Sequence, residues 1–199
     1  MRLILASASQ RRAEILSDAG FTFTKLSAAI DETPGPGEKP HDLVQRLAEA
    51  KAEFAAARAT GPAIVIGADT EVVLDGKVFG KPRSSDDARK MLEKLSGKIH
   101  QVMTGVTLIR LPDAERLSFV ETTHVHFAIL SADDISRYLA TSEHKDKAGA
   151  YAIQGRAGRY ISRIEGCYFN VVGLPLNRLQ SALTELGYPE DSQFSLHQG

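Results

Sequence analysis

The run Ala63-Ile64-Val65-Ile66 constrains the fold of this chain more than any other feature of its sequence. It is apolar at every position, which predicts a strand that is covered on both faces. Strands of that kind are typical of α/β proteins, in which helices pack on both sides of a sheet. Asp69 follows shortly after this run, so we place it at the strand's carboxyl end. Ligands of open α/β sheets bind at that edge, and Asp69 is therefore a candidate functional residue.

The rest of the chain supplies further strands and helices. A short apolar strand over 3–6 precedes a helix that begins near Ser7 and stops at Gly20, and Ser7 and Gln10 have capping-box spacing. Asp75-Gly76 joins two short apolar runs, which predicts a hairpin with a two-residue turn. Further helices are predicted after Pro40, after Ser84 or Ser85, near 135–141 and over 176–186, and two long strands over 102–111 and 117–130.

Length and composition favour one globular domain. The chain has 199 residues, 43% of them hydrophobic, and no shift in composition marks a boundary. We expect a single domain of one or two lobes over residues 1–188 and a frayed tail over 189–199.

Charge and cysteine usage limit the partners and the compartment. The formal net charge of -1 lacks the basic character of a general nucleic-acid binder, so an anion site must be local and its ligand small. No apolar run reaches membrane-spanning length, and the apolar run near the N-terminus is too short for a signal peptide. The single cysteine, Cys167, excludes an intramolecular disulfide. We expect a cytoplasmic protein that binds neither membranes nor polymeric nucleic acid.

Arg11 and Arg12 stand at the start of the first predicted helix. The N-terminus of a helix carries a partial positive charge, so a cation there costs about 0.3–1 kcal/mol unless an anion lies beside it. Backbone N–H groups, small hydroxyl residues and two guanidinium groups together suit a phosphate chain. The alternative is that both arginines are ordinary solvated residues of a surface helix.

Lys51 falls between Leu47 and Phe54 on the apolar side of the helix that follows Pro40. A lysine at such a position either extends its ammonium group to the surface or pairs with an anion. Spacing alone does not separate the two alternatives.

Five short segments occur in an order that resembles the Maf family of nucleoside triphosphate pyrophosphatases. They are Ser7-x-Ser9-x-Arg11-Arg12, Ala68-Asp69-Thr70, Gly80-Lys81-Pro82, Thr104-Gly105-Val106 and Asp146-Lys147-Ala148-Gly149-Ala150-Tyr151-Ala152-Ile153-Gln154-Gly155. Each is weak alone, but five in order make a chance match improbable. The resemblance implies an α/β fold like that of the inosine triphosphate pyrophosphatases, with an elongated mixed β-sheet flanked by helices and two lobes around a central cleft. It also implies a homodimer.

The family reaction cleaves a nucleoside triphosphate between its α- and β-phosphates. By resemblance, five residues bind the phosphates: Ser7, Arg11, Arg12, Lys51 and Lys81. Asp69 matches the catalytic carboxylate, which either accepts a proton from the attacking water or positions a metal ion. Glu32 belongs to a paired acidic element that binds metal together with Asp69, although a solvated acidic pair is an equal alternative. The expected cofactor is Mg²⁺ or Mn²⁺, because phosphate and hard oxygen ligands suit these ions.

Base selection is assigned to Arg11, Thr70 and Gln154. The version Ala152-Ile153-Gln154-Gly155 resembles the family branch that acts on dTTP and UTP, and an amide side chain can both donate to and accept from the imide edge of uracil or thymine. The implied role is the removal of modified pyrimidine nucleotides, and members of the family are linked to inhibition of septum formation. Two alternatives remain open: a pyrophosphatase of broader base preference, and a non-catalytic, nucleotide-binding regulator of cell division. No phosphate-binding Gly-x-x-x-x-Gly-Lys-Ser/Thr loop is present.

Overall fold

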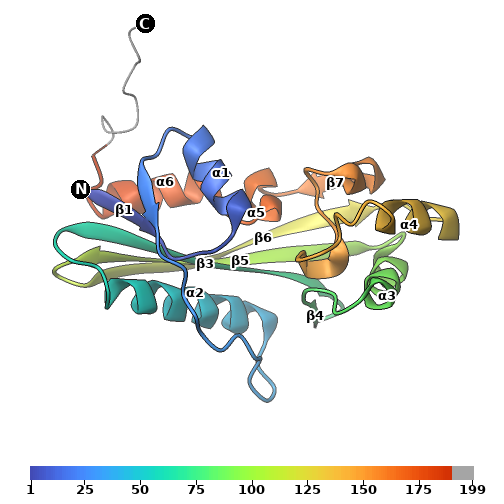
Figure 1. Cartoon of the computed structure of the whole chain (residues 1–199), viewed down its shortest axis with the longest axis horizontal. Coiled ribbons are helices and arrows are strands. Elements are labelled where there is room, and N and C mark those ends of the chain that lie inside the picture. Colours follow the sequence, from blue (N-terminus) through green and yellow to red (C-terminus); the bar gives the residue numbers. More distant parts are fainter. Residues whose placement is uncertain (190–199) are drawn as a thin grey trace, which may run out of the picture. The chain divides into compact units, whose positions relative to one another are not determined.

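The structure is a computed structural model that describes residues 1–189, and it contains both strands and helices (Figure 1). The elements in chain order are β1 (Arg2–Leu5), α1 (Gln10–Asp18), β2 (Phe23–Lys25), α2 (Pro40–Ala56), β3 (Ala63–Leu74), β4 (Lys77–Phe79), α3 (Ser85–Leu95), β5 (Ile99–Leu111), β6 (Glu115–Phe127), α4 (Ala132–Leu139), η1 (Ala148–Ala150), η2 (Arg156–Tyr160), β7 (Ile161–Glu165), α5 (Tyr168–Val172) and α6 (Leu176–Glu185). The expected C-terminal tail lies outside the described residues from position 190 onward.

The chain divides into two compact units. Unit 1 contains residues 1–69, 104–120 and the chain from Gly173 onward, and unit 2 contains Thr70–Met103 and Glu121–Val172. The strands form one seven-stranded sheet in the order β2-β1-β3-β5-β6-β7, with β4 paired to β3. Parallel and antiparallel pairs both occur in it, so the predicted α/β fold with a mixed sheet is confirmed. A single domain and a central cleft stay predictions.

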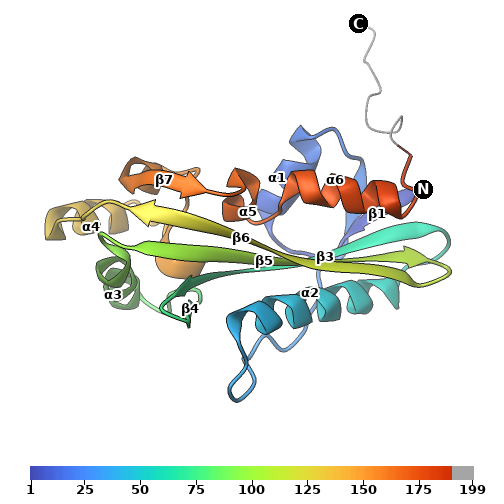
Figure 2. The ribbon, with the colours of Figure 1, turned by 180° about the vertical axis from the view of Figure 1, so that it is seen from behind.

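In unit 1, β1 pairs in parallel with both β2 and β3, with Leu5 opposite Ile66. Residues 63–66 of β3 are completely buried, as the apolar run predicts. The cover comes from α2 on one face of the strands and from α1 and α6 on the other (Figures 1 and 2). The parallel pairing of β1 with β3 ends at Leu5 and Ile66. The turn into α1 and the rest of β3 both begin at this carboxyl end of the pairing.

Two glycines let α2 lie directly on the sheet. A Cβ atom on Gly67 of β3 would lie 2.2 Å from the carbonyl oxygen of Ala48, and one on Gly105 of β5 would lie 2.2 Å from that of Val44. Side chains of a strand alternate between its two faces. Asp69, two residues after Gly67, therefore projects toward the same face of the sheet as α2.

The expected position of Asp69 at the end of its strand is wrong. β3 continues without interruption to Leu74, so Asp69 lies in its interior. The predicted Asp75-Gly76 turn explains the extension, because β3 turns back through it into β4. Both turn residues have positive φ, 51° for Asp75 and 73° for Gly76, as a turn of this hairpin class requires. What ends near Asp69 is the pairing with β1, whose last partner is Ile66.

Unit 2 has its own apolar core, in which α3 packs against α4 and η1. Ser84 caps α3 by accepting a hydrogen bond from the backbone N–H of Asp87, as one of the two predicted caps. Leu92 and Leu95 of α3 are buried together with Val125 of β6. Within residues 1–189, no helix is both long enough and apolar enough to cross a membrane.

Candidate active site

The ammonium group of Lys51 joins two carboxylates in unit 1. Its Nζ lies 2.6 Å from Oδ1 of Asp69 and 2.6 Å from Oε1 of Glu32. Lys51 and Asp69 are both buried, whereas about half of the Glu32 side chain is exposed. The structure thus favours pairing over surface extension for Lys51. It also brings together three residues with different predicted roles: Lys51 in phosphate binding, Asp69 in catalysis and Glu32 in metal binding.

The second carboxylate oxygen of Asp69 has a different environment. Oδ2 is buried and accepts no hydrogen bond from the part of the chain that the structure describes. A buried acceptor without a donor is costly, and each such atom needs an explanation. Proton acceptance from a water molecule, or coordination of a divalent cation, would satisfy it. Lys51 thus holds the carboxylate through Oδ1, and Oδ2 is the oxygen that no donor among the described residues occupies.

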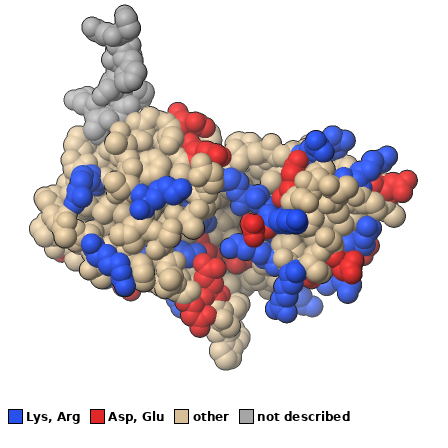
Figure 3. All heavy atoms as spheres, in the orientation of Figure 1, with Lys and Arg blue, Asp and Glu red and all other residues tan. Residues whose placement is uncertain are grey.

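The loop between β2 and α2 carries Glu32 and is itself anchored to α2. Glu38 accepts two hydrogen bonds from Arg46, at 2.6 and 2.9 Å, and one from the backbone N–H of Gly35. The bonds from Arg46 lower the pKa of Glu38 to about 2. Asp31 accepts a bond from the N–H of Thr33, and hydrogen bonding by Thr33 lowers its pKa. Acidic side chains gather on this loop (Figure 3), and Glu32 extends from it to the ammonium group of Lys51.

The turn from β1 into α1 brings Ser7 and Arg12 together. Arg12 is buried, and it donates from Nε to the carbonyl oxygen of Gly173 at 2.9 Å and from Nη1 to Oγ of Ser7 at 3.1 Å. These bonds fix the plane of the guanidinium group. The helix cap is Ser9, which accepts from the backbone N–H of Arg12, so the predicted capping role of Ser7 is wrong. Ser7 is instead turned toward Arg12.

Arg11 occupies the first turn of α1 and is half-buried. The first turn of this helix contains no acidic residue. Phosphate binding by Arg11 at this helix terminus stays a prediction.

The other predicted site residues belong to unit 2. Lys81 is exposed in the segment between β4 and α3, Thr70 is a half-buried residue of β3, and Gln154 is exposed in a turn. The backbone N–H of Gly149 donates to the carbonyl oxygen of Gly80 at 3.2 Å. This bond ties the segment that contains Gln154 to the residue before Lys81.

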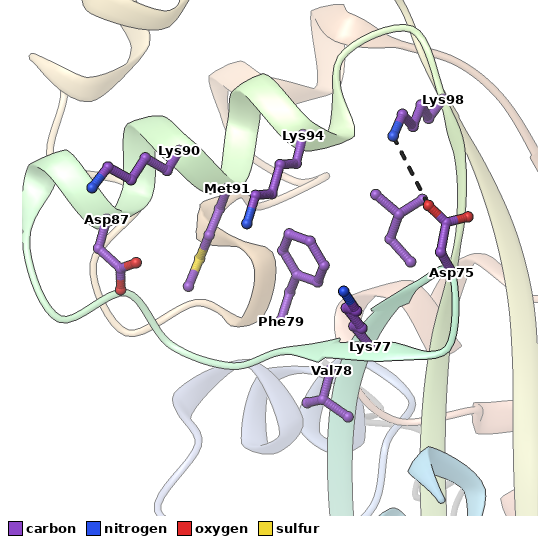
Figure 4. Close-up of a pocket in the computed structure, with 10 residues that line it drawn as sticks. Asp75, Lys77, Val78, Phe79, Asp87, Lys90, Met91, Lys94 and Lys98 are labelled. Atoms are coloured by element: carbon purple, nitrogen blue, oxygen red, sulfur yellow. Dashed lines mark ion pairs between the residues drawn. The ribbon is translucent and has the colours of Figure 1, made fainter.

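Unit 2 also has a groove of about 440 Å³ between α3 and β4 (Figure 4). Lys90 and Lys94 of α3 line it together with Phe79 of β4, and Nζ of Lys94 lies 5.9 Å above the Phe79 ring. None of the predicted site residues lines this groove. It is a separate feature from the residues described above.

Two glycines that position the site were not among the residues predicted from the sequence. Gly67 sets the distance between α2 and β3, and the carbonyl group of Gly173 holds Arg12. A glycine inside an apolar strand often marks a close backbone approach, so Gly67 had a signal in the sequence. The partner of Arg12 lies 161 positions away, and no local pattern identifies it.

The carboxylates that could hold a metal ion are few. The described residues contain no group of three or more His, Cys, Asp or Glu side chains arranged around one point. Zinc and iron sites usually need such a set. Mg²⁺ is commonly held by one or two carboxylates plus the phosphates of a substrate. Glu32 and Asp69, with the buried Oδ2 atom of Asp69, fit that second pattern.

Solved structures share the fold. The Ham1 protein of Staphylococcus aureus matches with a TM-score of 0.52 at 17% identity, over 94% of this chain and 100% of that chain. A HAM1 protein from Coxiella burnetii matches with a TM-score of 0.53 at 16% identity, over 93% and 99% of the two chains. At this identity the likeness concerns the fold alone.

Relatives in sequence are much closer. The chain is 50% identical to the dTTP/UTP pyrophosphatase of Symbiobacterium thermophilum over 94% of its own length and 95% of the relative's. It is 47% identical to the dTTP/UTP pyrophosphatase of Pelotomaculum thermopropionicum, over 94% and 97% of the two lengths. The family model described as Maf-like protein matches residues 2–186. The chain therefore belongs to the Maf family.

Proposed function

We propose that this protein is a nucleoside triphosphate pyrophosphatase that hydrolyses dTTP and UTP, together with modified pyrimidine nucleotides, to the monophosphate and pyrophosphate. The observation that carries the proposal is the Glu32–Lys51–Asp69 cluster, in which Asp69 keeps one buried carboxylate oxygen without a hydrogen-bond donor. Relatives of about 50% identity bear the name dTTP/UTP pyrophosphatase, which supports the choice of substrate.

In the proposed reaction, Oδ2 of Asp69 accepts a proton from a water molecule while the water oxygen bonds to the α-phosphorus. The bond from that phosphorus to the bridging oxygen breaks, and pyrophosphate leaves with the electron pair. Lys51 keeps Asp69 oriented through Oδ1. General base catalysis of this kind typically contributes 10²- to 10⁴-fold to the rate.

Phosphate binding is assigned to Ser7, Arg11, Arg12 and Lys81. The triphosphate carries about four negative charges, and fixed cations stabilise the charge that develops on the leaving group. The buried bonds of Arg12 to Gly173 and Ser7 hold its guanidinium rigid, so little entropy is lost when phosphate binds. Lys51 is the fifth residue assigned to the phosphates, and a divalent cation on Glu32 and Asp69 would leave its charge available to them.

Mg²⁺ or Mn²⁺ is the proposed cofactor, held by Asp69 and Glu32. When bound, such an ion would neutralise part of the phosphate charge. The buried Oδ2 atom of Asp69, which has no donor among the described residues, and the half-exposed Glu32 carboxylate support this assignment. We also predict a homodimer that acts in the cytoplasm.

The test is a panel of dTTP, UTP, CTP, GTP and ATP with Mg²⁺ or Mn²⁺, in which pyrophosphate and orthophosphate are measured separately. We expect pyrophosphate from dTTP and UTP with kcat/KM at least tenfold above the other nucleotides. Equal turnover of all five would point to a pyrophosphatase of broad base preference. Binding of nucleotides without any product would favour a regulator and overturn the proposal.

A further inference from the structure

Gln154, to which we assign base selection, lies on a short turn directly before η2. A bond from the backbone N–H of Gly155 to the carbonyl oxygen of Ala152, at 3.1 Å, closes the turn. The Gln154 side chain is exposed. An amide that must distinguish one base edge from another has to be placed to within a fraction of an ångström, so the backbone on either side needs support from elsewhere.

Support on the N-terminal side comes from Tyr151. Its side chain is buried, and its hydroxyl group lies 2.7 Å from Nε2 of His100 on β5. The Tyr151 ring meets the Phe127 ring edge to face at a centroid distance of 5.0 Å, and the His100 ring at 5.4 Å. Burial lowers the pKa of His100 to about 4 and raises that of Tyr151. Both groups are therefore neutral at physiological pH, and the bond between them carries no charge.

Support on the C-terminal side comes from Glu143, which follows α4. Its Oε2 atom accepts a hydrogen bond from the backbone N–H of Arg156 at 2.7 Å. The same oxygen lies against Gly155, where a Cβ atom would approach it to 2.2 Å. Bonds from an N–H group to a carboxylate are roughly twice as strong as neutral ones. Glu143 therefore fixes the chain two residues after Gln154.

We infer that His100 and Glu143 are positioning residues for base selection. They lie 54 and 11 positions before Gln154 in the sequence, yet they hold the residues three before and two after it. The inference rests on the proposed function, which assigns Gln154 to the base. Neither residue has to touch the nucleotide, because each acts through the backbone of the turn.

The first test measures the turn without any nucleotide. Hydrogen exchange of the hydrogen-bonded backbone amides of Gly155 and Arg156 should become at least tenfold faster in Glu143→Ala. It should stay within about twofold of wild type in Glu93→Ala, a matched control on the exposed face of α3. Unchanged exchange in Glu143→Ala would overturn the inference whatever the enzyme does.

The second test measures selectivity as the ratio of kcat/KM for dTTP to kcat/KM for GTP. We expect Glu143→Ala to lower this ratio by about 10- to 100-fold, mainly through a higher KM for dTTP. Glu143→Gln retains an acceptor oxygen and should recover the ratio to within about threefold of wild type. A merely structural role would change the overall rate and leave the ratio intact.

Tyr151→Phe tests the His100 side without emptying the buried position. It removes only the hydroxyl group that meets His100, and we expect a fall of about tenfold in the same ratio with normal expression. A wild-type ratio in both Tyr151→Phe and Glu143→Ala would overturn the inference.

Gln154→Ala separates this inference from the proposed function. If Gln154→Ala loses selectivity while Glu143→Ala and Tyr151→Phe keep it, the positioning inference fails and the base assignment stands. If Gln154→Ala keeps selectivity, the base assignment fails, and the inference fails with it.

Discussion

Replacing Gly67 with alanine should separate α2 from the sheet and break the active-site cluster. The added Cβ atom would lie 2.2 Å from the carbonyl oxygen of Ala48 and 2.6 Å from the backbone nitrogen of Ala52. Non-bonded heavy atoms need well over 3 Å, so α2 must move outward by about 1 Å. Both neighbours are backbone atoms of a helix, and no side-chain rotation relieves the contact.

The displacement affects stability first. Overpacking of a buried site typically costs about 1–3 kcal/mol. A backbone clash at a fully buried strand lies at the upper end of that range. For a chain of this size, about 1 kcal/mol shifts Tm by 2–4 °C, so we expect Tm to fall by roughly 6–12 °C.

Activity should fall as well, because Lys51 lies on the displaced helix. Its Nζ is 2.6 Å from Oδ1 of Asp69, and a shift of about 1 Å takes that pair beyond hydrogen-bond distance. Misplacement of this size costs about 100-fold in rate. The assay is pyrophosphate release from dTTP at a temperature at which circular dichroism shows the variant to be folded.

Gly35→Ala is the matched control. A Cβ atom there meets only the Glu38 side chain, at 3.6 Å, which is an ordinary contact. Its Tm and rate should stay close to wild type. A Gly67→Ala variant with wild-type Tm and wild-type rate would refute the claim that this glycine sets the position of Lys51.

Three further predictions concern charge. Lys51→Met should destabilise the protein by about 3 kcal/mol in urea unfolding, because it leaves the buried Asp69 carboxylate beside Glu32 without a cation. Adding Asp69→Asn to this variant should recover at least half of the lost stability. Equal stability of Lys51→Met and wild type would contradict the pairing. Burial lowers the pKa of His100 from 6.5 to about 4, so the unfolded chain takes up the proton at a higher pH than the folded protein does. The contribution of neutral His100 to the free energy of unfolding is therefore fully present above about pH 6.5. The free energy of unfolding falls by about 3 kcal/mol as the pH drops from 6.5 to 4, and this group lowers it no further below pH 4. His100→Gln should remove that part of the pH dependence when urea midpoints at pH 7 and pH 5 are compared, and an unchanged dependence would show that His100 is not the group responsible. Removal of divalent cations with EDTA should stop turnover and Mg²⁺ or Mn²⁺ should restore it, whereas full turnover in EDTA would exclude the proposed cofactor.

The local elements of this fold were predictable because local rules govern them. The apolar run 63–66 identifies a buried strand, Asp75-Gly76 identifies a hairpin turn, and Ser84 identifies a helix start. The error at Asp69 has a physical origin. The polar residues Asp69-Thr70-Glu71 resemble the end of a strand, but β3 continues because its pairing changes from β1 to β4 along its length.

The sequence predicted the charged residues of the candidate site, but not the residues that position them. Family motifs indicated Lys51 and Asp69, and the structure shows that they form one ion pair with Glu32 as a second partner. Gly173 and Glu143 have no local signature, since each acts on a backbone group or side chain that folding brings to it. Such contacts depend on tertiary structure, which spacing along the sequence does not encode.

The most direct test of the account compares Asp69→Asn with wild type. Pyrophosphate release from dTTP gives the rate, and titration with a non-hydrolysable α,β-imido analogue of dTTP gives the affinity. We predict that Asp69→Asn lowers kcat by about 10³-fold, since the amide cannot accept the proton of the attacking water, while the Kd for the analogue changes by less than tenfold. A kcat within tenfold of wild type would contradict the assignment of Asp69 as the catalytic base.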